Sequence, residues 1–425
     1  MATEASGLGD LDSYIMQATA YLNDAERHGA GTGTTGETRP ALPAVAPQRV
    51  APRVPSLQLA TEVLVQLRLS AEATGGPAKA WGCLLALLAA CPGPERGELT
   101  LRALRVAAPV GDTASQLARA VVEDDVHRAQ VPLLLAAASS SIAALAQALL
   151  RLAGGPSGGN APLERELAAL VREAELIPTS ADAAVAAAAL HRAVEGLLGS
   201  LRASLPRPGG ASGRPDQAGH LPPCVVALCH FLYAAAEVKF SVLAAQNAVV
   251  ALLVTCVLTP SLLRVAAQRP RDGGATVGLS ERVSELSRLL QRVAHFAHHD
   301  GSPEELAARG GAEDLETVLQ HVTALRELVA RVLMLPLERA LGLEASAEDA
   351  EDAATWLVET CRRWAAGLGT ASAGGTGRGK QQQLMAAAQG IARLGEPAAA
   401  AEALPPGPAT QPGASQAAPS AAAGP

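Results

Sequence analysis

Aromatic residues are nearly absent from this sequence. Its 425 residues include only three Trp, three Tyr and three Phe, although 49% of the chain is hydrophobic. A core built from this chain must therefore consist mostly of Leu, Ala and Val. Leu and Ala are strong helix formers, whereas the aromatic residues and Ile that favour strands are scarce. The composition predicts an all-α protein, folded as a large bundle of many helices.

Basic residues are not concentrated anywhere in the chain. There are 34 Lys and Arg against 41 Asp and Glu, a net charge of -7, and most basic residues stand beside acidic ones. Binding of nucleic acid requires a concentrated basic surface. We therefore expect no nucleic-acid partner.

Closely paired cysteines and a hydrophobic leader are also missing. The six cysteines form no CxxC pair, and most sit inside apolar runs, where a thiol acts as a small hydrophobic side chain. The acidic N-terminal sequence MATEASGLGDLDSY lacks the apolar segment of a signal peptide. These features favour a reducing, cytoplasmic location.

Charged residues are absent from Phe240 to Leu263, a stretch about long enough to cross a bilayer. Gln246 and Asn247 interrupt its apolar character, and Thr259-Pro260 predicts a helix break. Two interpretations fit this stretch, a membrane span and the buried central helix of a large helical domain. We favour the second, because nothing else in the chain resembles a membrane protein, and we expect membrane association only through a partner.

Gly- and Pro-rich stretches divide the chain into parts of different composition. Helical periodicity begins near Ser56 and persists to about Leu368. The stretch before it is rich in Gly, Thr and Pro, and the stretch after it is too poor in large apolar residues to offset chain entropy. We predict a short N-terminal amphipathic helix (1–28), a flexible linker (29–55), a helical domain (56–369) and a disordered tail (370–425).

Local patterns refine this division. In the N-terminal part Leu11, Ile15, Ala18 and Leu22 share one helical face. A short helix around 381–394 is compatible with the tail sequence. Helix ends inside the domain are expected at Cys91-Pro92, Pro109-Gly111, Gly154-Gly159, Pro206-Gly219, Pro270-Gly274 and Gly310-Gly311.

Motifs of catalytic or ligand-binding sites are either missing or out of context. Residues 31–36 fit GxGxxG and residues 374–380 approach a P-loop, but neither follows a predicted strand, and Gln381 stands where a P-loop has Ser or Thr. His295 and His299 share a helix face, but no third metal ligand lies at a reliable spacing. No Ser/His/Asp or Cys/His arrangement is recognisable. We therefore predict no catalytic chemistry of the chain's own, no cofactor and no metal.

Three blocks of sequence carry a family resemblance. They read LPPCVVALCHFLYAAAEVKF (221–240), LLVTCVLTPSLL (252–263) and SELSRLLQRVAHFAHH (284–299). Their order and spacing resemble those of the Ras GTPase-activating (RasGAP) domain family, with two further similar stretches, ELIPTSADAA (175–184) and TWLVETCRRW (355–364). The resemblance covers most of the predicted helical domain.

The resemblance implies an all-helical domain that grips the switch regions of a Ras-like GTPase. In this family an arginine finger enters the nucleotide site, where a guanidinium stabilises transition-state charge and is worth about 10³ to 10⁵ in rate. Here the finger position falls on Ala138, and a second family arginine, which steadies the finger loop, falls on Cys256. The full set of equivalent positions is Ala136, Ala137, Ala138, Ser139, Ser140 and Ser141 in the loop, with Leu145, Cys256, Thr259, Pro260, Gln291 and His295 elsewhere.

These replacements predict a degenerate member of the family, because an alanine cannot bring positive charge to a phosphate. We expect a regulator or binder of a GTP-bound, Ras-like small GTPase with lost or weak GTPase-activating activity. Two alternatives stay open. One is an active GTPase activator that uses a displaced arginine, such as Arg128 or Arg151. The other is a helical scaffold that makes no contact with a GTPase.

Overall fold

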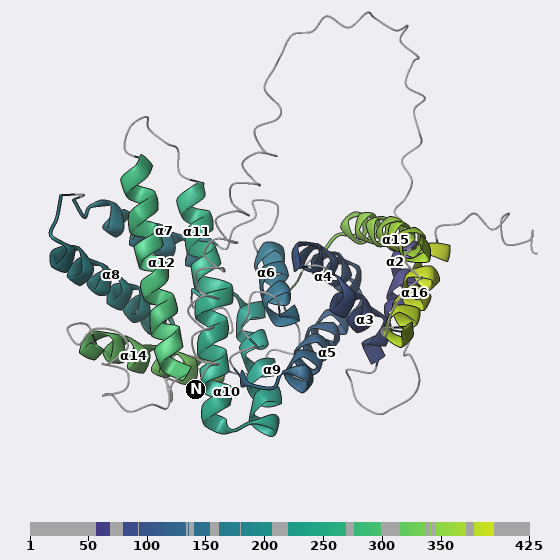
Figure 1. Cartoon of the computed structure of the whole chain (residues 1–425), viewed down its shortest axis with the longest axis horizontal. Coiled ribbons are helices and arrows are strands. Elements are labelled where there is room, and N and C mark those ends of the chain that lie inside the picture. Colours follow the sequence, from purple (N-terminus) through teal and green to yellow (C-terminus); the bar gives the residue numbers. More distant parts are fainter. Residues whose placement is uncertain are drawn as a thin grey trace, which may run out of the picture.

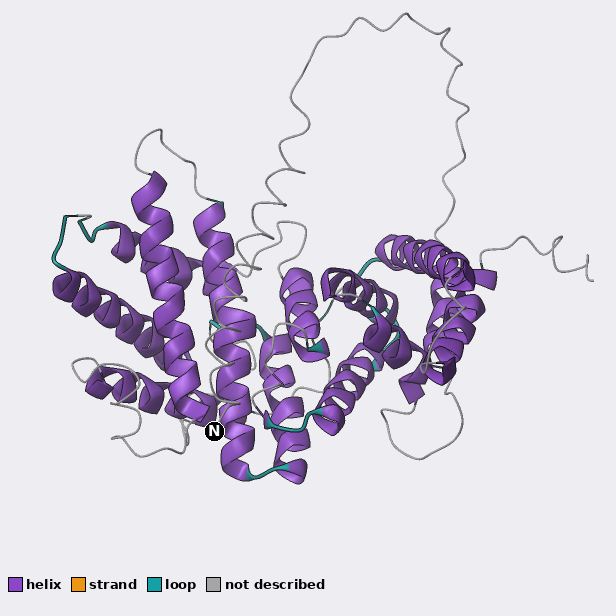
Figure 2. Cartoon of the chain, in the orientation of Figure 1, coloured by secondary structure: helices purple, strands orange, loops and turns teal. Residues whose placement is uncertain are grey.

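The described part of the chain is built from helices. The computed structural model describes residues 57–68, 80–91, 93–132, 135, 140–153, 161–178, 180–205, 220–268, 276–298, 315–335, 341, 343, 345–370 and 378–394. Within these ranges there are helices joined by turns and loops, and no strand (Figure 2). The all-α fold class predicted from the composition is confirmed. The amphipathic pattern at 8–28 and the linker at 29–55 lie outside the described residues.

The helices do not follow the order of the sequence along the bundle, because the C-terminal α15 and α16 lie beside the N-terminal α2 and α3 (Figure 1). The first half contains α2 (Gln58–Arg68), α3 (Gly82–Ala90), α4 (Gly93–Ala107), α5 (Thr113–Arg128), α6 (Ser141–Ala153), α7 (Ala161–Glu175) and α8 (Ala183–Ser204). The second half contains α9 (Pro223–Lys239), α10 (Val242–Ala251), the π-helix η4 (Leu252–Leu258), α11 (Thr259–Ala267), α12 (Thr276–His298), α14 (Leu315–Leu333), α15 (Ala347–Thr370) and α16 (Arg378–Arg393).

Several helix ends lie where proline and glycine predict them. Helix α3 ends before Cys91-Pro92, and α6 ends before the glycine-rich stretch at 154–159. Between α4 and α5, Gly111 has a φ of 52°. This left-handed conformation is easy for glycine and disfavoured for residues with a Cβ, so Gly111 fixes the turn.

The helices form two groups on either side of a central layer (Figure 1). Helices α2, α3, α4, α15 and α16 gather at one end, where α15 packs against α2, α4 and α16. Helices α7, α8, α12 and α14 gather at the other end, where α8 packs against α7 and α14. The run from α10 to α11 lies between them with α6 and α9. Leu, Ala and Val side chains from both groups join one continuous core, as the scarcity of aromatic residues requires.

The central element is one continuous helix from Val242 to Ala267, and the break predicted at Thr259-Pro260 is wrong. The chain passes through the π-helical turn η4 just before the proline, and the N–H of Thr259 bonds the carbonyl of Val254, five residues back. A π-turn changes the hydrogen-bond register of a helix. Pro260, which has no N–H, is therefore accommodated without ending the helix.

Two described helices are long and apolar enough to cross a membrane, α8 and the continuous helix Val242–Ala267. In the most apolar window of the second helix, 78% of the residues are buried inside the bundle. A core helix of a helical protein meets the same criteria of length and composition. These two helices are therefore only weak evidence for a membrane span.

The packed helices extend beyond the predicted domain boundary at residue 369. Helix α16 lies inside the segment 370–425 and packs against α15, α3 and α2. Ala388 and Ile391 on this helix are fully buried in the common core. The short helix that the sequence allows around 381–394 is therefore present, and the disordered tail predicted for 370–425 is corrected for residues 378–394.

Candidate functional site

The first turn of α6 follows the loop expected to correspond to the arginine-finger loop. Residues 136–139, including Ala138, lie outside the described residues. The Ser140 hydroxyl accepts a hydrogen bond of 3.0 Å from the N–H of Ala143 and donates one of 3.1 Å to the carbonyl of Leu135. The Asp125 carboxylate accepts a bond of 2.8 Å from the N–H of Ile142. The first N–H groups of a helix have no partner within the helix, and two of those in α6 are therefore hydrogen-bonded to side chains instead.

Asp125, the carboxylate beside this turn, ends an acidic stretch of α5. Glu123, Asp124 and Asp125 form the last acidic stretch of α5, and burial raises the pKa of all three carboxyl groups. For Asp125, hydrogen bonds from Ile142 and Ser141 oppose that rise in pKa. A buried carboxylate at a helix N-terminus occupies the place that would otherwise favour an anion. The base of the loop therefore does not favour an approaching phosphate.

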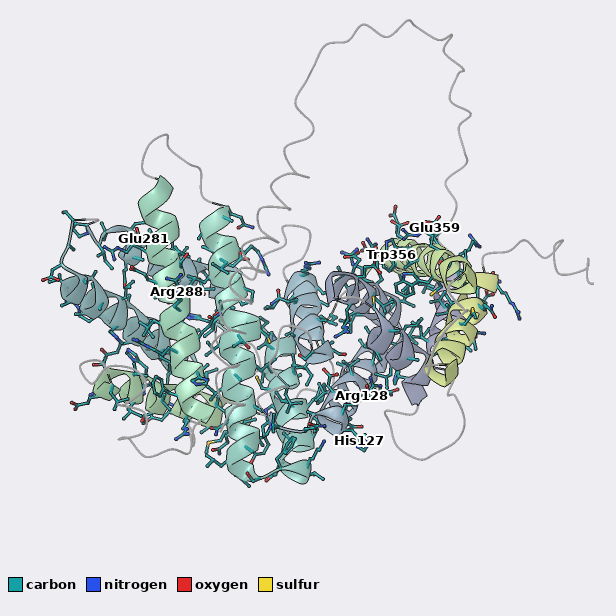
Figure 3. The ribbon with its side chains drawn as sticks, in the orientation of Figure 1. His127, Arg128, Glu281, Arg288, Trp356 and Glu359 are labelled. Carbon is teal, nitrogen blue, oxygen red and sulfur yellow. The ribbon has the colours of Figure 1, made fainter. Side chains whose placement is uncertain are left out.

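The arginines considered as displaced fingers are engaged elsewhere. Arg128, at the end of α5 beside His127 (Figure 3), forms an ion pair of 2.8 Å with Asp124. Arg151 forms an ion pair of 3.8 Å with Glu98. It lies ten residues beyond the start of α6 at Ser141, about 15 Å along the helix at 1.5 Å per residue. Arg151 therefore does not lie at the start of α6, whereas Arg128 is close enough to Asp125 for its charge to lower the pKa of that carboxyl group.

A hydrogen bond joins α6 to the central helix. The side-chain amide of Gln147 donates to the carbonyl oxygen of Cys256 at 2.5 Å. In a regular α-helix this carbonyl would accept from residue 260, which is a proline without an N–H. Gln147 therefore supplies this carbonyl with a donor from another helix. The loop-following helix and the helix with the family-like proline are tied together at this point.

Most of the other residues that the resemblance assigns to the GTPase-binding groove are buried. Leu145, Cys256, Thr259 and Gln291 are all less than 5% exposed. Pro260 is half-buried, and His295 on α12 is exposed. The packing of α6 and α12 against η4 brings these elements together. Residues that would face a partner in the family are thus largely core residues in this chain. Among them, His295 has the side chain most accessible to a partner.

Lys239 makes contacts whose role the sequence did not reveal. Its ammonium group donates to the carbonyls of Val126, His127 and Ala129 at 2.8, 2.7 and 2.6 Å. A cation at these carbonyls complements the negative end of the α5 dipole. The basic residue that precedes Phe240 therefore fixes the start of the chain segment that leads to the candidate loop.

A histidine pair between α8 and α14 was also not predicted. His191 Nδ1 and His321 Nε2 share a hydrogen bond of 3.0 Å, and both side chains are buried. Burial lowers the pKa of His321, the neighbouring His191 lowers it further, and Glu195 opposes the shift. The pairing joins residues 130 positions apart, so no local sequence pattern contains it.

The cysteines and acidic residues offer no obvious chemistry. All six cysteines are free and buried. Burial raises the pKa of Cys256 to about 11 and that of each of the other five thiols to about 12, far from the thiolate form that a nucleophile needs. Among the described residues no group of three or more His, Cys, Asp and Glu side chains could hold a metal ion.

Comparison with known proteins adds no relative to these observations. No family model matches the chain, and no curated protein matches it at a significant level. A functional proposal for this chain therefore depends on its own residues and contacts.

Proposed function

We propose that this chain is a degenerate RasGAP-like module that binds a GTP-loaded, Ras-like small GTPase without supplying a catalytic arginine. The observation that carries the proposal is the bond between Gln147 and Cys256. It links the helix after the candidate finger loop to the central helix at Cys256, the residue to which the resemblance assigns the family's second arginine position. The three family-like blocks at 221–240, 252–263 and 284–299 support the same assignment.

Weak or absent activation follows from the charges around the loop. Phosphoryl transfer is accelerated by positive charge placed at the phosphate oxygens. The sequence from Ala129 to Leu150 contains no Arg or Lys, and the nearby Arg128 is paired with Asp124. At the start of α6 stand the carboxylate of Asp125 and the hydroxyl of Ser140. Such a surface leaves the GTPase to its intrinsic rate of hydrolysis.

The test is single-turnover GTP hydrolysis by a panel of Ras-like GTPases with excess full-length chain. The wild-type chain should leave the rate within a few-fold of the intrinsic value. Acceleration of about a hundredfold, which is within the range of a working arginine finger, contradicts the proposal.

A gain-of-function variant sharpens this test. Ala138→Arg places a guanidinium in the candidate loop and should accelerate hydrolysis at least about tenfold, a small part of what a natural finger supplies. Ala188→Arg, on the exposed face of α8, is the matched control and should have no effect. The same measurement is repeated with arginine at 136, 137 and 139. If none of these loop variants hydrolyses GTP faster than the Ala188→Arg control, the loop is not the arginine-finger loop.

A second candidate function is a helical scaffold that makes no contact with a GTPase. It is favoured by the burial of the residues that the resemblance assigns to the GTPase-binding groove. Leu145, Cys256 and Gln291 cannot touch a partner from inside the core. A scaffold of this kind binds no member of the GTPase panel in either nucleotide state, whereas the proposed module prefers the GTP-loaded state.

A further inference from the structure

A contact between two buried histidines joins the first halves of α8 and α14. His191 Nδ1 lies 3.0 Å from His321 Nε2, and the two rings are stacked with their centroids 5.2 Å apart. In such a bond one imidazole nitrogen donates a proton and the other accepts it. If both rings are protonated, two N–H groups face each other and the bond is lost. The contact therefore depends on the number of protons that the two rings hold.

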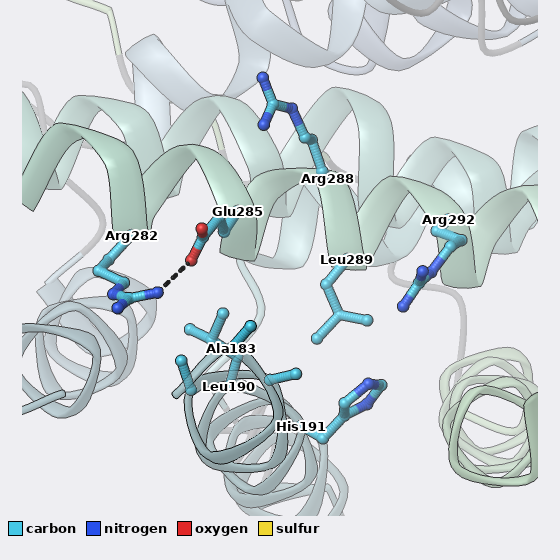
Figure 4. Close-up of a pocket in the computed structure, with 10 residues that line it drawn as sticks. Ala183, Leu190, His191, Arg282, Glu285, Arg288, Leu289 and Arg292 are labelled. Carbon is cyan, nitrogen blue, oxygen red and sulfur yellow. Dashed lines mark hydrogen bonds and ion pairs between the residues drawn. The ribbon is translucent and has the colours of Figure 1, made fainter. Parts of the chain in front are cut away.

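Charged groups of α8 and α12 lie near the pair. Glu195, one turn after His191 on α8, is exposed, and its charge raises the pKa of His321. His191 also lines a hollow between α8 and α12, where Arg292 points towards α8 and its positive charge opposes protonation (Figure 4). The α12 residues that line this hollow with His191 are Arg282, Glu285, Arg288, Leu289 and Arg292.

The other elements that pack against α8 and α14 bring less charge to the pair. Helix α10 contains no titratable residue, and α14 itself has no charged residue within four positions of His321. His230 of α9 bonds the backbone at Val332, near the other end of α14. The last carboxylates of α7, Glu173 and Glu175, are exposed. A proton on the pair is therefore influenced mainly by the second histidine and by the groups of α8 and α12.

The second halves of α8 and α14 are joined by contacts that do not include a histidine. Arg202 forms an ion pair of 2.5 Å with Glu327, and the Arg331 guanidinium donates to the carbonyl of Arg202 at 3.0 Å. The Ser200 hydroxyl donates to Glu166 of α7 at 2.7 Å. Because carboxyl groups ordinarily titrate near pH 4, mildly acidic solution leaves these contacts in place.

The first half of α8 buries less apolar surface than the second. From Ala183 to Ala189 it consists of alanines and one valine, and that residue, Val185, is 58% exposed. A segment with few buried apolar contacts opens at a low cost in free energy. The second half is packed more firmly, because it buries Leu197, Leu198 and Leu201.

We propose that His191 and His321 form a pH switch, which holds the first halves of α8 and α14 together at neutral pH and releases them in mildly acidic solution. The second halves stay joined and act as the hinge. One proton on the pair leaves a positive charge buried, and a second one removes the hydrogen bond, so the protonated rings are more stable once water reaches them. The switch is independent of the proposed GTPase binding.

The pH range of the switch follows from the pKa of His321. Burial, and then the neighbouring His191, hold this pKa below the ordinary value of 6.5 in the closed form. In the open form water reaches the ring and the pKa returns towards 6.5. Opening is therefore favoured as pH falls from 6.5 to the pKa of the closed form, by about tenfold per pH unit for each proton bound.

The experiment measures distances between two spin labels on the full-length chain by double electron–electron resonance. All six native cysteines are buried, so the labels attach to exposed cysteines introduced in pairs. Ala188→Cys with Gln320→Cys spans the first halves, and Ala203→Cys with Met334→Cys is the matched pair on the second halves. As pH falls from 7.5 to 5.5, a second, longer distance should appear for the first pair. Below pH 6.5 the ratio of its population to the original one should rise about tenfold per pH unit. The matched pair should keep one distance.

Variants assign the response to the histidines. In His321→Gln the amide oxygen still accepts from protonated His191, so the first label pair should keep one distance down to pH 5.5. His191→Gln tests the same bond from the other helix. The matched control is His127→Gln, an exposed histidine of α5, which should respond as the wild type does.

Three results would overturn the proposal. The first is an unchanged distance for the first label pair of the wild type at pH 5.5. The second is a lengthening of both label pairs together, which indicates global unfolding instead of a hinged opening. The third is a response that persists unchanged in both His321→Gln and His191→Gln.

Discussion

The side-chain amide of Gln147 donates a hydrogen bond of 2.5 Å to the carbonyl oxygen of Cys256. The two residues are 109 positions apart in the chain and lie on α6 and on the central helix. Pro260 removes the backbone donor that this carbonyl would use in a regular α-helix. The proline and the glutamine therefore form one structural unit that holds α6 against the core.

This relationship predicts a dependence between two substitutions. Gln147→Met removes the hydrogen bond to the Cys256 carbonyl and should lower the free energy of unfolding by about 1 to 3 kcal/mol. In a Pro260→Ala background the backbone N–H of residue 260 is restored, and the same change should cost clearly less. Urea unfolding of the four chains of this double-mutant cycle measures the difference. An equal cost in both backgrounds would show that the two residues act independently.

The start of α6 predicts a contrast between two substitutions of one residue. Asp125→Ala removes the acceptor for the Ile142 N–H and should cost about 0.5 to 2 kcal/mol. Asp125→Asn keeps an oxygen acceptor and removes a charge whose burial raises the carboxyl pKa, so it should cost less at pH 7. The free energy of unfolding at pH 7 compares them. A larger loss for Asn than for Ala would contradict the capping role.

The same residue gives a pH dependence of defined sign. Because the folded-state pKa of Asp125 lies above the ordinary value of 3.8, the folded state binds the proton more tightly. Its contribution to stability therefore falls as pH rises from 3.8 through the folded-state pKa. The stability of Asp125→Asn relative to the wild type should therefore rise across this window and then level off.

The buried histidine pair predicts the opposite dependence near neutral pH. The folded-state pKa of His321 lies below its ordinary value of 6.5, so the unfolded chain binds the proton first. Stability should fall as pH drops below 6.5, until the folded-state pKa has also been passed. His321→Gln keeps a hydrogen-bonding side chain beside His191 but cannot titrate. Urea midpoints at pH 7.5 and 5.5 should differ more for the wild type than for this variant, and an equal difference would contradict the assignment.

Composition was sufficient to predict the fold class, because a chain rich in Leu and Ala with almost no aromatic residues has little alternative to helix. Helix ends followed from local signals such as Pro92. The break expected at Pro260 did not occur, because the π-turn before it and Gln147 from another helix accommodate the proline. Local sequence contains neither of these compensations.

The candidate site was harder to predict than the fold, since its contacts join distant parts of the chain. Lys239 bonds carbonyls more than 100 residues earlier, and His191 meets His321 across 130 residues. Gln291 is a polar residue that the family resemblance places in a groove, yet it is buried in the core. Resemblance assigns a position to a residue, but its exposure depends on the side chains that pack around it.

The central claim is that a GTPase can be bound without being activated. The most direct measurement is the equilibrium affinity of the full-length chain for Ras-like GTPases loaded either with a non-hydrolysable GTP analogue or with GDP. The account predicts saturable binding of at least one GTPase, at least about tenfold tighter in the GTP state, a difference of about 1.4 kcal/mol. Equal affinity for the two nucleotide states, or no binding across the panel, would contradict it.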